Sequence, residues 1–364
     1  MEIYFHGYKA RYEMLDRFFA PVRSSMPVTK LNIFVNIDDF FHMLHRPLIN
    51  NDFQVIGQNG GKQLVSNVLN LLGHYKNWAV KRGYDVKIFG VYTSCLRSFK
   101  NQIYLPEYRK KFKNDNDPMN TIYYYINQTL NDSMKIFQLI AEYLPDVYLI
   151  DSKHIEPSVI PCYIAEFGIS KSDWNILITR DVYDLQYAYR DRWTVIRPKG
   201  DNSSTLNRDN IWDYLNEKEK IYKEGIVYFR PELFPLCMSV TGNKYRSIPR
   251  LRRIGWRTLF SYLSKVKEEY EDYHISIIQQ KFLELLKSHK ITDDDFFSNL
   301  SCVDVQMQSE MLMEIDKTLI ESQIVDRYDE DALYKINRER FPLFPINLEF
   351  LFRERRKSSV TPFG

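Results

Sequence analysis

The order in which short apolar runs and amphipathic stretches alternate limits this chain to few folds. Residues 31–37, LNIFVNI, form a β-branched and aromatic run that is typical of a buried strand. Residues 62–82 then place apolar side chains at helical spacing, and residues 86–92, VKIFGVY, repeat the strand pattern. Strands that alternate with helices predict right-handed crossovers and a doubly wound, mostly parallel α/β sheet.

The alternation continues and then gives way to helical patterns. The further expected elements of the sheet region are helices at 134–144 and 158–167, with strands at 147–150, 175–179 and 194–196. After about residue 245, the expected helices are 256–270, 274–288, 305–322 and 330–337. We therefore expect a C-terminal helical lobe that packs onto the sheet.

Composition narrows the class of protein but does not identify a partner. The chain has 364 residues, of which 44% are hydrophobic and 27% charged, which is ordinary for a soluble globular protein. Its four cysteines are far apart and show no CxxC spacing, which favours reduced, buried thiols over a zinc site or a disulfide framework. No apolar run approaches the roughly 18 residues that span a bilayer. We expect a cytoplasmic protein, in the host cytoplasm if the source is a bacteriophage, with no membrane partner.

Two segments concentrate positive charge. The stretch 241–257 carries six cations and no acid. These are Lys244, Arg246, Arg250, Arg252, Arg253 and Arg257. Six phosphate contacts give a log–log salt slope of about −5 on duplex DNA. The second cluster is Arg109, Lys110, Lys111 and Lys113, with Tyr104 and Tyr108 interleaved, a mixture that suits a single strand. For both segments the alternative is a solvated basic loop without a partner.

Polar residues follow several of the expected strands. They are Asn36–Asp39, Tyr92–Ser94, Asp151 and Thr179–Asp184. Ligands of doubly wound sheets bind beyond the carboxyl ends of the strands, so these segments predict one shared site.

Four segments, taken in order, resemble one family. Residues 241–259, TGNKYRSIPRLRRIGWRTL, resemble the GDxSDNIPGVxGIGxKTA segment of the flap-endonuclease and 5′→3′ exonuclease family of PIN-like 5′ nucleases. Residues 98–118 resemble the family's xFRxExYPEYKANRxxxP, which leads into an arch that straddles single-stranded DNA. Residues 175–200 are similar to xILTxDKDLxQLLxxxxxVxxPxG, and 154–168 take the place of YEADDVLAxLA. The resemblance covers roughly 31–270.

The resemblance implies a two-metal phosphodiesterase site, but most of its carboxylate positions differ here. Hard divalent ions require oxygen ligands, and two ions close together require many carboxylates. The departures from the family's acids are Asn36, Thr93, Ser158, Val159, Asn243 and Arg246. The acids that remain as vestigial catalytic candidates are Asp38, Glu156, Asp181 and Asp184, of which Glu156, Asp181 and Asp184 are weak metal candidates. We expect no resident cofactor beyond, at most, one weakly bound Mg²⁺ or Mn²⁺.

Each remaining acid also has a purely structural interpretation. Asp181 and Asp184 follow a strand and precede a helical pattern, where an aspartate often serves as an N-cap. Glu156 precedes Pro157 at the start of an expected helix, where the helix dipole favours a negative charge.

The segment that contacts duplex DNA in the family is better retained here than the metal site. In the family, the segment equivalent to 241–259 forms a helix-hairpin-helix-like clamp on duplex phosphate, and its last turn glycine persists as Gly255. The resemblance thus implies a degenerate 5′ nuclease that binds duplex, branched or flap DNA, as a subunit of a replication, repair or transcription assembly. An active nuclease with a single-ion site and a protein-interaction scaffold are the alternatives.

The expected organisation has four parts. An N-terminal extension covers 1–30, and a PIN-like domain covers 31–240 with an arch-like insertion at about 98–132. A helical DNA-binding lobe covers 241–350, and a basic tail covers 351–364.

Overall fold

The computed structural model describes most of the expected sheet and helical regions. The described residues are 29–41, 58–93, 132–153, 155–198, 204–211, 214, 233–242, 248–269, 275–341 and 348. The proposed arch, with its cluster at 109–113, and the basic tail lie outside them.

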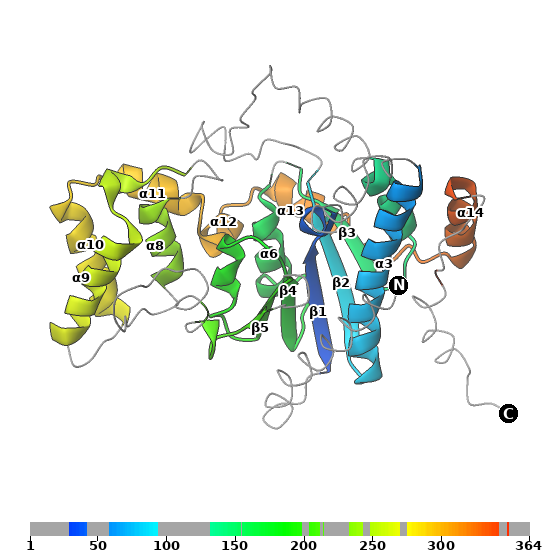
Figure 1. Ribbon diagram of the computed structural model, residues 1–364, viewed down its shortest axis with the longest axis horizontal. Helices are drawn as coiled ribbons and strands as arrows, with labels where there is room; N and C mark the ends of the chain where they lie inside the picture. The colour runs from blue at the N-terminus through cyan, green and yellow to red at the C-terminus, as the bar shows by residue number, and fades with distance from the viewer. Residues whose placement is uncertain are drawn as a thin grey trace, which may run out of the picture.

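Six strands form one sheet in the order β3-β2-β1-β4-β5-β6 (Figure 1). The strands are β1 Lys30–Asn36, β2 Asp85–Tyr92, β3 Val147–Asp151, β4 Trp174–Ile178, β5 Trp193–Arg197 and β6 Ser204–Leu206. All neighbours are parallel except β6, which pairs antiparallel with β5. The doubly wound, mostly parallel sheet is therefore confirmed. The short strand β6 was not predicted, because STL is too short to show a periodic pattern.

Helices cover both faces of the sheet because the strand residues alternate between two cores. Leu31, Ile33 and Val35 face α3 (Gln58–Lys81) and the helix at 132–141. Phe34 faces the other side, toward α6 (Ile160–Glu166) and the short 3-10 helices η2 (Pro157–Val159) and η3 (Tyr183–Tyr187). A period of two along a strand places successive side chains on opposite faces.

Many of the described aromatic rings, and the described thiols, are buried. Phe34 stacks on Phe89 with ring centroids 5.1 Å apart and on Trp193 at 5.6 Å. Such pairs each contribute about 0.5–1.5 kcal/mol beyond their buried area. Cys162, Cys237 and Cys302 are buried and free, as the cysteine spacing predicted, and Cys95 lies outside the described residues.

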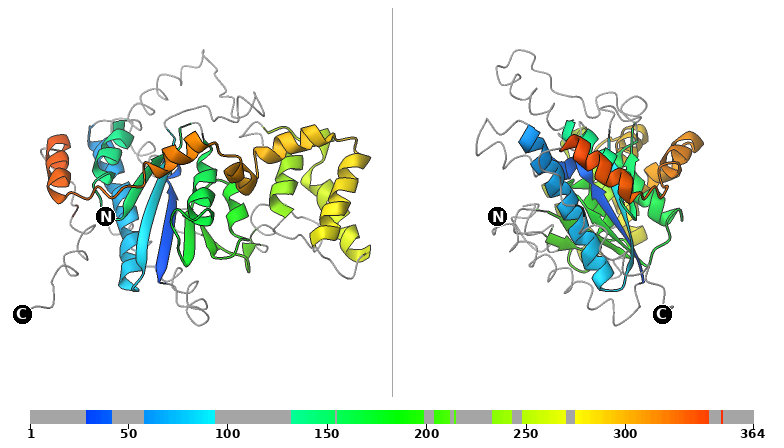
Figure 2. Two further views of the ribbon diagram at one scale, coloured as in Figure 1. Left: turned by 180° about the vertical axis from the view of Figure 1, so that it is seen from behind. Right: turned by 90° about the vertical axis from the view of Figure 1, so that its right-hand side faces the viewer.

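A helical lobe lies beyond β5 and continues the core of the α6 face (Figures 1 and 2). Its helices are α8 Phe234–Thr241, α9 Trp256–Glu269, α10 Ile275–Ser288 and α11 Asp293–Ser301. The chain returns across α6 through α12 (Val305–Glu310) and α13 (Glu314–Glu321), and α14 (Glu330–Arg340) packs on the α3 side. None of the described helices combines the length and hydropathy needed to cross a bilayer.

The single helix predicted at 305–322 is wrong, because capping side chains divide it. Asp304 caps α12 by accepting from the amides of Gln306 and Met307. Asp316 accepts from Met313 N, at 3.3 Å, and starts α13. Two helices, α8 and α11, were not predicted. The signal for α11 was present, since Thr292 caps it and three aspartates occupy its first turn.

Candidate functional site

The sheet has one topological switch point, between β1 and β4. From β1 the chain first adds β2 and β3 on one side, and then crosses to add β4 and β5 on the other. Ligand sites in such sheets form at the carboxyl edge of this crevice. A ligand site is therefore expected at the residues that follow β1 and β4.

Side chains from both strand ends meet there around the hydroxyl of Thr179. Asp39 Oδ2 accepts from Arg180 N at 2.8 Å and lies 3.2 Å from Thr179 Oγ1. Asp184 Oδ2 lies 2.6 Å from the same hydroxyl, which also accepts from Asp181 N at 3.0 Å. A hydroxyl carries one proton, so it donates to only one of the two carboxylates at a time.

The environment of Asp39 disfavours its charged form. Burial raises the pKa of this carboxyl above its usual 3.8, and the nearby charge of Asp181 adds to the effect. The hydrogen bonds from Arg180 N and Thr179 and the charge of Arg180 act in the opposite direction, but burial is the largest cause. Keeping an ionised aspartate here therefore costs folding free energy.

Substituting Asp39→Asn should therefore alter the pH dependence of stability. Because the folded pKa is raised, the native state holds its proton more tightly, and stability is lost as pH rises through the folded pKa. The variant lacks this loss, so its stability relative to the unaltered protein should be higher at pH 7 than at pH 4. Urea unfolding at both pH values measures the difference.

Asp173→Asn is the matched control with the opposite sign. Asp173 Oδ2 accepts from Lys30 N and from the amide and hydroxyl of Thr29, which lowers its pKa. Its contribution is present above its unfolded pKa and is lost as pH falls through the folded value. The control should be more destabilised at pH 7 than at pH 4. Identical pH profiles for the two variants would contradict the assignment.

The carboxylate of the neighbouring residue, Asp38, contacts the end of β2 instead of Thr179. Its Oδ2 accepts from Thr93 N, at 3.0 Å, on the β2 side of β1. Thr93, which stands where the resemblance implies a carboxylate, donates from Oγ1 to Lys153 O at 3.2 Å. The structure thus brings Asp39, and not the predicted Asp38, to Thr179 and Asp184.

Asn36 explains why the two aspartates diverge. Its Oδ1 accepts from Asp39 N, at 3.1 Å, and so caps the short helix at 37–41. Successive helical residues point about 100° apart, so adjacent acids serve different neighbours. The Asn36 cap was the sequence signal that distinguishes them.

The acids considered as N-caps have other local roles. The N-cap of η3 is Val182, so neither Asp181 nor Asp184 occupies that position. Asp181 Oδ1 instead accepts from Tyr183 N at 3.0 Å and closes a local turn. Glu156 does occupy the N-cap position of η2, although its side chain makes no capping hydrogen bond there.

The substituted positions near Glu156 belong to the core. Val159 is fully buried, and Glu156 is only 1% exposed. Ser158 O accepts from the phenol of Tyr187, at 2.6 Å, which itself accepts from Cys162 N. Ser158 and Val159 therefore contribute to the packed core and do not supply ligands.

The donor set does not fit two metal ions. Across the described ranges, no three His, Cys, Asp or Glu side chains are arranged so that they could hold a metal. Val159 and Thr93 supply no carboxylate, and the Oδ2 atoms of Asp39 and Asp184 both contact one hydroxyl.

A hairpin between α8 and α9 carries the basic residues. Gly242 ends α8 at φ 66° and ψ 178°, a conformation that is essentially restricted to glycine. A Cβ at this position would meet Ile248 O at 2.6 Å and Arg250 N at 2.7 Å. The returning strand of the hairpin therefore lies directly against Gly242.

Two arginines project from this hairpin. Arg250 and Arg252 are exposed, and Arg252 has a left-handed φ of 43° within the 3-10 turn η5 (Leu251–Arg253). Arg250 Nε lies 3.4 Å from Thr241 O, which links the two arms of the hairpin. Within the described part of the chain, neither guanidinium pairs with a carboxylate. Gly255 directly precedes α9, as predicted.

Several of the predicted DNA-binding residues lie outside the described part of the chain. Lys244 and Arg246 lie outside the described residues, as do Arg109, Lys110, Lys111 and Lys113. Arg253 and Arg257 lie in η5 and α9, but the structure does not describe their side chains.

A buried amide from α11 holds the hairpin together. Asn299 Nδ2 donates to Ser239 O at 2.6 Å and to Pro249 O at 2.8 Å. Ser239 is in the last turn of α8, where carbonyls lack helical partners. Sequence reasoning missed Asn299, which is about 50 residues from the hairpin along the chain.

Asn299→Asp should destabilise the protein more than Asn299→Ala. The aspartate has the same shape, but its carboxylate oxygens would face the carbonyl oxygens of Ser239 and Pro249 and repel them. Alanine would only leave these two carbonyls without a hydrogen-bond donor. A buried unsatisfied group costs about 1–3 kcal/mol, and a buried charge costs more. Urea unfolding of both variants measures the difference. If both variants lost the same free energy of unfolding, water would have to hydrogen-bond the two carbonyls in place of Asn299.

Comparisons with known proteins agree with this architecture. No family model and no curated protein matches the sequence. Among solved structures, the bacteriophage T5 flap endonuclease in a pseudo-enzyme–product complex with DNA and metal ions has a TM-score of 0.53 and 14% identity. The T5 protein co-crystallised with metal ions has a TM-score of 0.54 and 12% identity. Each match covers 86% of this chain and 98% of the other.

The chain has a 5′-nuclease fold. The sequence motifs predicted this fold, and the structural likeness confirms it. In the 5′-nuclease fold of this chain, the switch point carries Asp39, Thr179 and Asp184, and the α8–α9 hairpin carries Arg250 and Arg252.

Proposed function

We propose that this chain is a catalytically degenerate 5′-nuclease-like protein that binds duplex or branched DNA without sequence specificity. The observation that carries the proposal is the α8–α9 hairpin, whose exposed Arg250 and Arg252 are held in place by Gly242 and Asn299. Exposed guanidinium groups that have no carboxylate partner among the described residues favour phosphate contacts, which position a protein on DNA without reading bases.

The charge along the hairpin supports the same partner. With Lys244, Arg246, Arg253 and Arg257, the segment 241–257 has six cations and no acid. Loss of an acid beside a phosphate removes a repulsion, so Asn243 and Arg246 improve DNA binding at positions where the family has aspartates. A similar fold has been crystallised in complex with DNA.

The switch-point site supports the loss of cleavage. Two-metal hydrolysis requires a symmetric clamp on the attacking and leaving oxygens. Here Asn36 caps a helix and Val159 lies in the core, so both positions serve folding. A second basic cluster, at 109–113, would hold a single strand or flap, and a protein assembly would supply any catalysis.

Parallel binding and cleavage assays test the proposal. With a fluorescent flap substrate in EDTA, we expect binding with a log–log salt slope of about −5. With Mg²⁺ or Mn²⁺, we expect no cleavage above a blank. Efficient cleavage that is lost in Asp181→Ala would overturn the degenerate assignment. Absence of any DNA binding would favour a scaffold that kept only the fold.

A second candidate function is a nuclease with a single-ion site. The observation that favours it is that the carboxylates of Asp39 and Asp184 both contact the Thr179 hydroxyl, and that the charge of Asp181 lies close enough to raise the pKa of Asp39. It requires Asp39 and Asp184 to turn away from the hydroxyl, and Asp181 to leave Tyr183 N, so that the three carboxylates converge on one ion. Anomalous density between them in a crystal soaked with Mn²⁺ would support this function, and metal-dependent cleavage would have to disappear in Asp39→Ala and Asp184→Ala.

A further inference from the structure

The sheet ends in an edge strand whose outward backbone groups follow a defined pattern. β3 pairs with β2 and lies at the edge of the sheet. Ile88 N donates to Asp146 O at 2.9 Å, and Ser152 N donates to Tyr92 O at 2.8 Å. Backbone groups alternate in direction along a strand, so the N–H and C=O groups of Val147, Leu149 and Asp151 point away from β2.

The outward N–H and C=O groups of Asp151 are already hydrogen-bonded, because the side-chain amide of Gln323 contacts both of them. Gln323 Oε1 accepts from Asp151 N at 2.8 Å, and its Nε2 donates to Asp151 O at 3.3 Å. The same Nε2 donates to Leu319 O at 2.9 Å, which fixes the amide on the end of α13. The carboxyl end of the β3 edge is thereby closed.

The segment 323–329, which we name the strap, follows the rest of this edge without pairing to it. It leaves β3 at Asp151 and returns to Tyr143, whose carbonyl accepts from Asp329 N at 3.4 Å. It therefore runs opposite to β3. Among the described residues, no hydrogen-bond partner is found for the outward amides and carbonyls of Val147 and Leu149.

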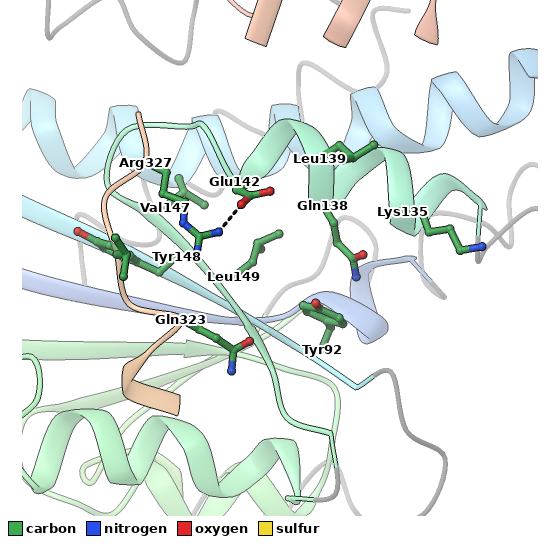
Figure 3. A pocket seen from close by; sticks show the side chains of 11 residues that line it. Tyr92, Lys135, Gln138, Leu139, Glu142, Val147, Tyr148, Leu149, Gln323 and Arg327 are labelled. Carbon is green, nitrogen blue, oxygen red and sulfur yellow. Dashed lines mark hydrogen bonds and ion pairs between the residues drawn. The ribbon is translucent and has the colours of Figure 1, made fainter. Parts of the chain in front are cut away.

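A cavity of about 440 Å³ separates the strap from β3 (Figure 3). Leu149, Leu139 and Val325 give it an apolar lining, and Tyr92 and Gln138 add polar groups. Arg327 on the strap pairs with Glu142, so these two charges neutralise each other across the cavity (Figure 3). Lys135 adds a positive charge to the lining and lies 3.9 Å from Asp132. The cavity thus combines a strand edge that has no hydrogen-bond partner among the described residues at Val147 and Leu149 with a wall of mixed apolar and polar groups.

We propose that this cavity binds an extended segment of a partner protein, which adds to β3 through main-chain hydrogen bonds. An open edge presents donors and acceptors at strand spacing, and such edges are extended by peptides in several recognition domains. The distance from Val147 to the closed end at Asp151 corresponds to about 13 Å at about 3.3 Å per residue. The site therefore takes three or four residues.

The lining sets the chemistry of that segment. Side chains that alternate along it would face Leu139 and Val325, which favours small apolar residues. Glu142 and Arg327 already pair, and Lys135 leaves a positive charge in the lining, so a neutral or acidic segment fits better than a basic one. This inference does not depend on DNA binding, because the hairpin and the β3 edge lie at opposite ends of the sheet (Figure 1).

Selection from a displayed library of short random peptides, followed by binding measurements on the enriched sequences, tests the proposal. Leu149→Pro removes an N–H that points away from β2, and proline is tolerated at such positions of an edge strand. We expect at least tenfold weaker binding to Leu149→Pro than to Leu149→Ala, because both variants lose the leucine side chain but only the proline lacks the outward N–H. Far-UV circular dichroism checks that both variants are folded.

Backbone methylation of the peptide provides a test that does not depend on the folding of a variant. N-methylation at alternate residues should abolish binding in one register and leave it intact in the other, because only one set of amides faces β3. Enriched peptides that tolerate methylation in both registers would overturn the proposal. Failure of the library to enrich any peptide that binds would do so as well.

Other occupants of the edge give distinct results. Slow hydrogen exchange at Leu149 in the isolated protein would show that another segment of the same chain covers the edge. A dimer in gel filtration that dissociates in Leu149→Pro would show that a second copy pairs there. Either result replaces the partner-protein proposal.

Discussion

Replacing Arg250 and Arg252 together by glutamine is expected to weaken DNA binding by about 60-fold at about 0.1 M salt, because each phosphate contact scales affinity with about the −0.9 power of salt concentration. The log–log salt slope should fall by about two in magnitude for the same reason. Fluorescence anisotropy with duplex and flap substrates over a range of salt concentrations measures both quantities. The loss should be uniform across sequences, since phosphate contacts read no bases.

Arg338→Gln with Arg340→Gln is the matched control. These arginines are also exposed but lie on α14, away from the helical lobe (Figure 1). The control should retain full affinity and an unchanged slope. If both double variants lose affinity equally, binding depends on overall charge and the hairpin has no special role.

Gly242→Ala is expected to lower the free energy of unfolding by about 3 kcal/mol or more. A side chain at φ 66° and ψ 178° is strained by about 1–3 kcal/mol. The added methyl group would also approach the backbone at Pro249 and Arg250 to 2.7 Å, so the hairpin has to open. Thermal or urea unfolding measures the stability loss, and DNA affinity should fall with it.

Gly83→Ala separates backbone strain from steric overlap. Gly83 also has a positive φ, of 79°, but a Cβ there would meet nothing within 4 Å. Gly83→Ala should lower the free energy of unfolding by only about 1–2 kcal/mol, the usual penalty for a left-handed residue with a side chain. A loss at Gly83 as large as that at Gly242 would show that close approach of the hairpin is unimportant.

The fold was predictable because its signals are local and repeated. The strand patterns of β1 and β2 and the apolar stripe of α3 have boundaries within a few residues of those expected. The division between α12 and α13 was missed because it depends on the capping side chains of Asp304 and Asp316 within a continuous helical pattern. Periodicity reports buried faces and is insensitive to such interruptions.

The site was only partly predictable because its contacts join distant segments. The sequence indicated the strand ends and the basic hairpin, but it favoured Asp38 over Asp39. The choice between them depends on the Asn36 cap and on Thr179, which lies 140 residues away from Asp39. Asn299 could not be identified, since a buried asparagine on a short helix has no sequence signature until its two carbonyl partners are known.

The position of β1 in the sheet also affects how the chain folds during synthesis. β1 is central, and one of its two neighbours, β4, begins at Trp174. At a synthesis rate of about 5–20 residues per second, β1 leaves the ribosome several seconds before β4 does. During that interval, one hydrogen-bonding side of an apolar strand has no native partner, and such long-range parallel pairing is intrinsically slow. Occupancy of chaperones on the nascent chain should therefore begin after β1 and end once β4 is released, and the switch-point site forms only then.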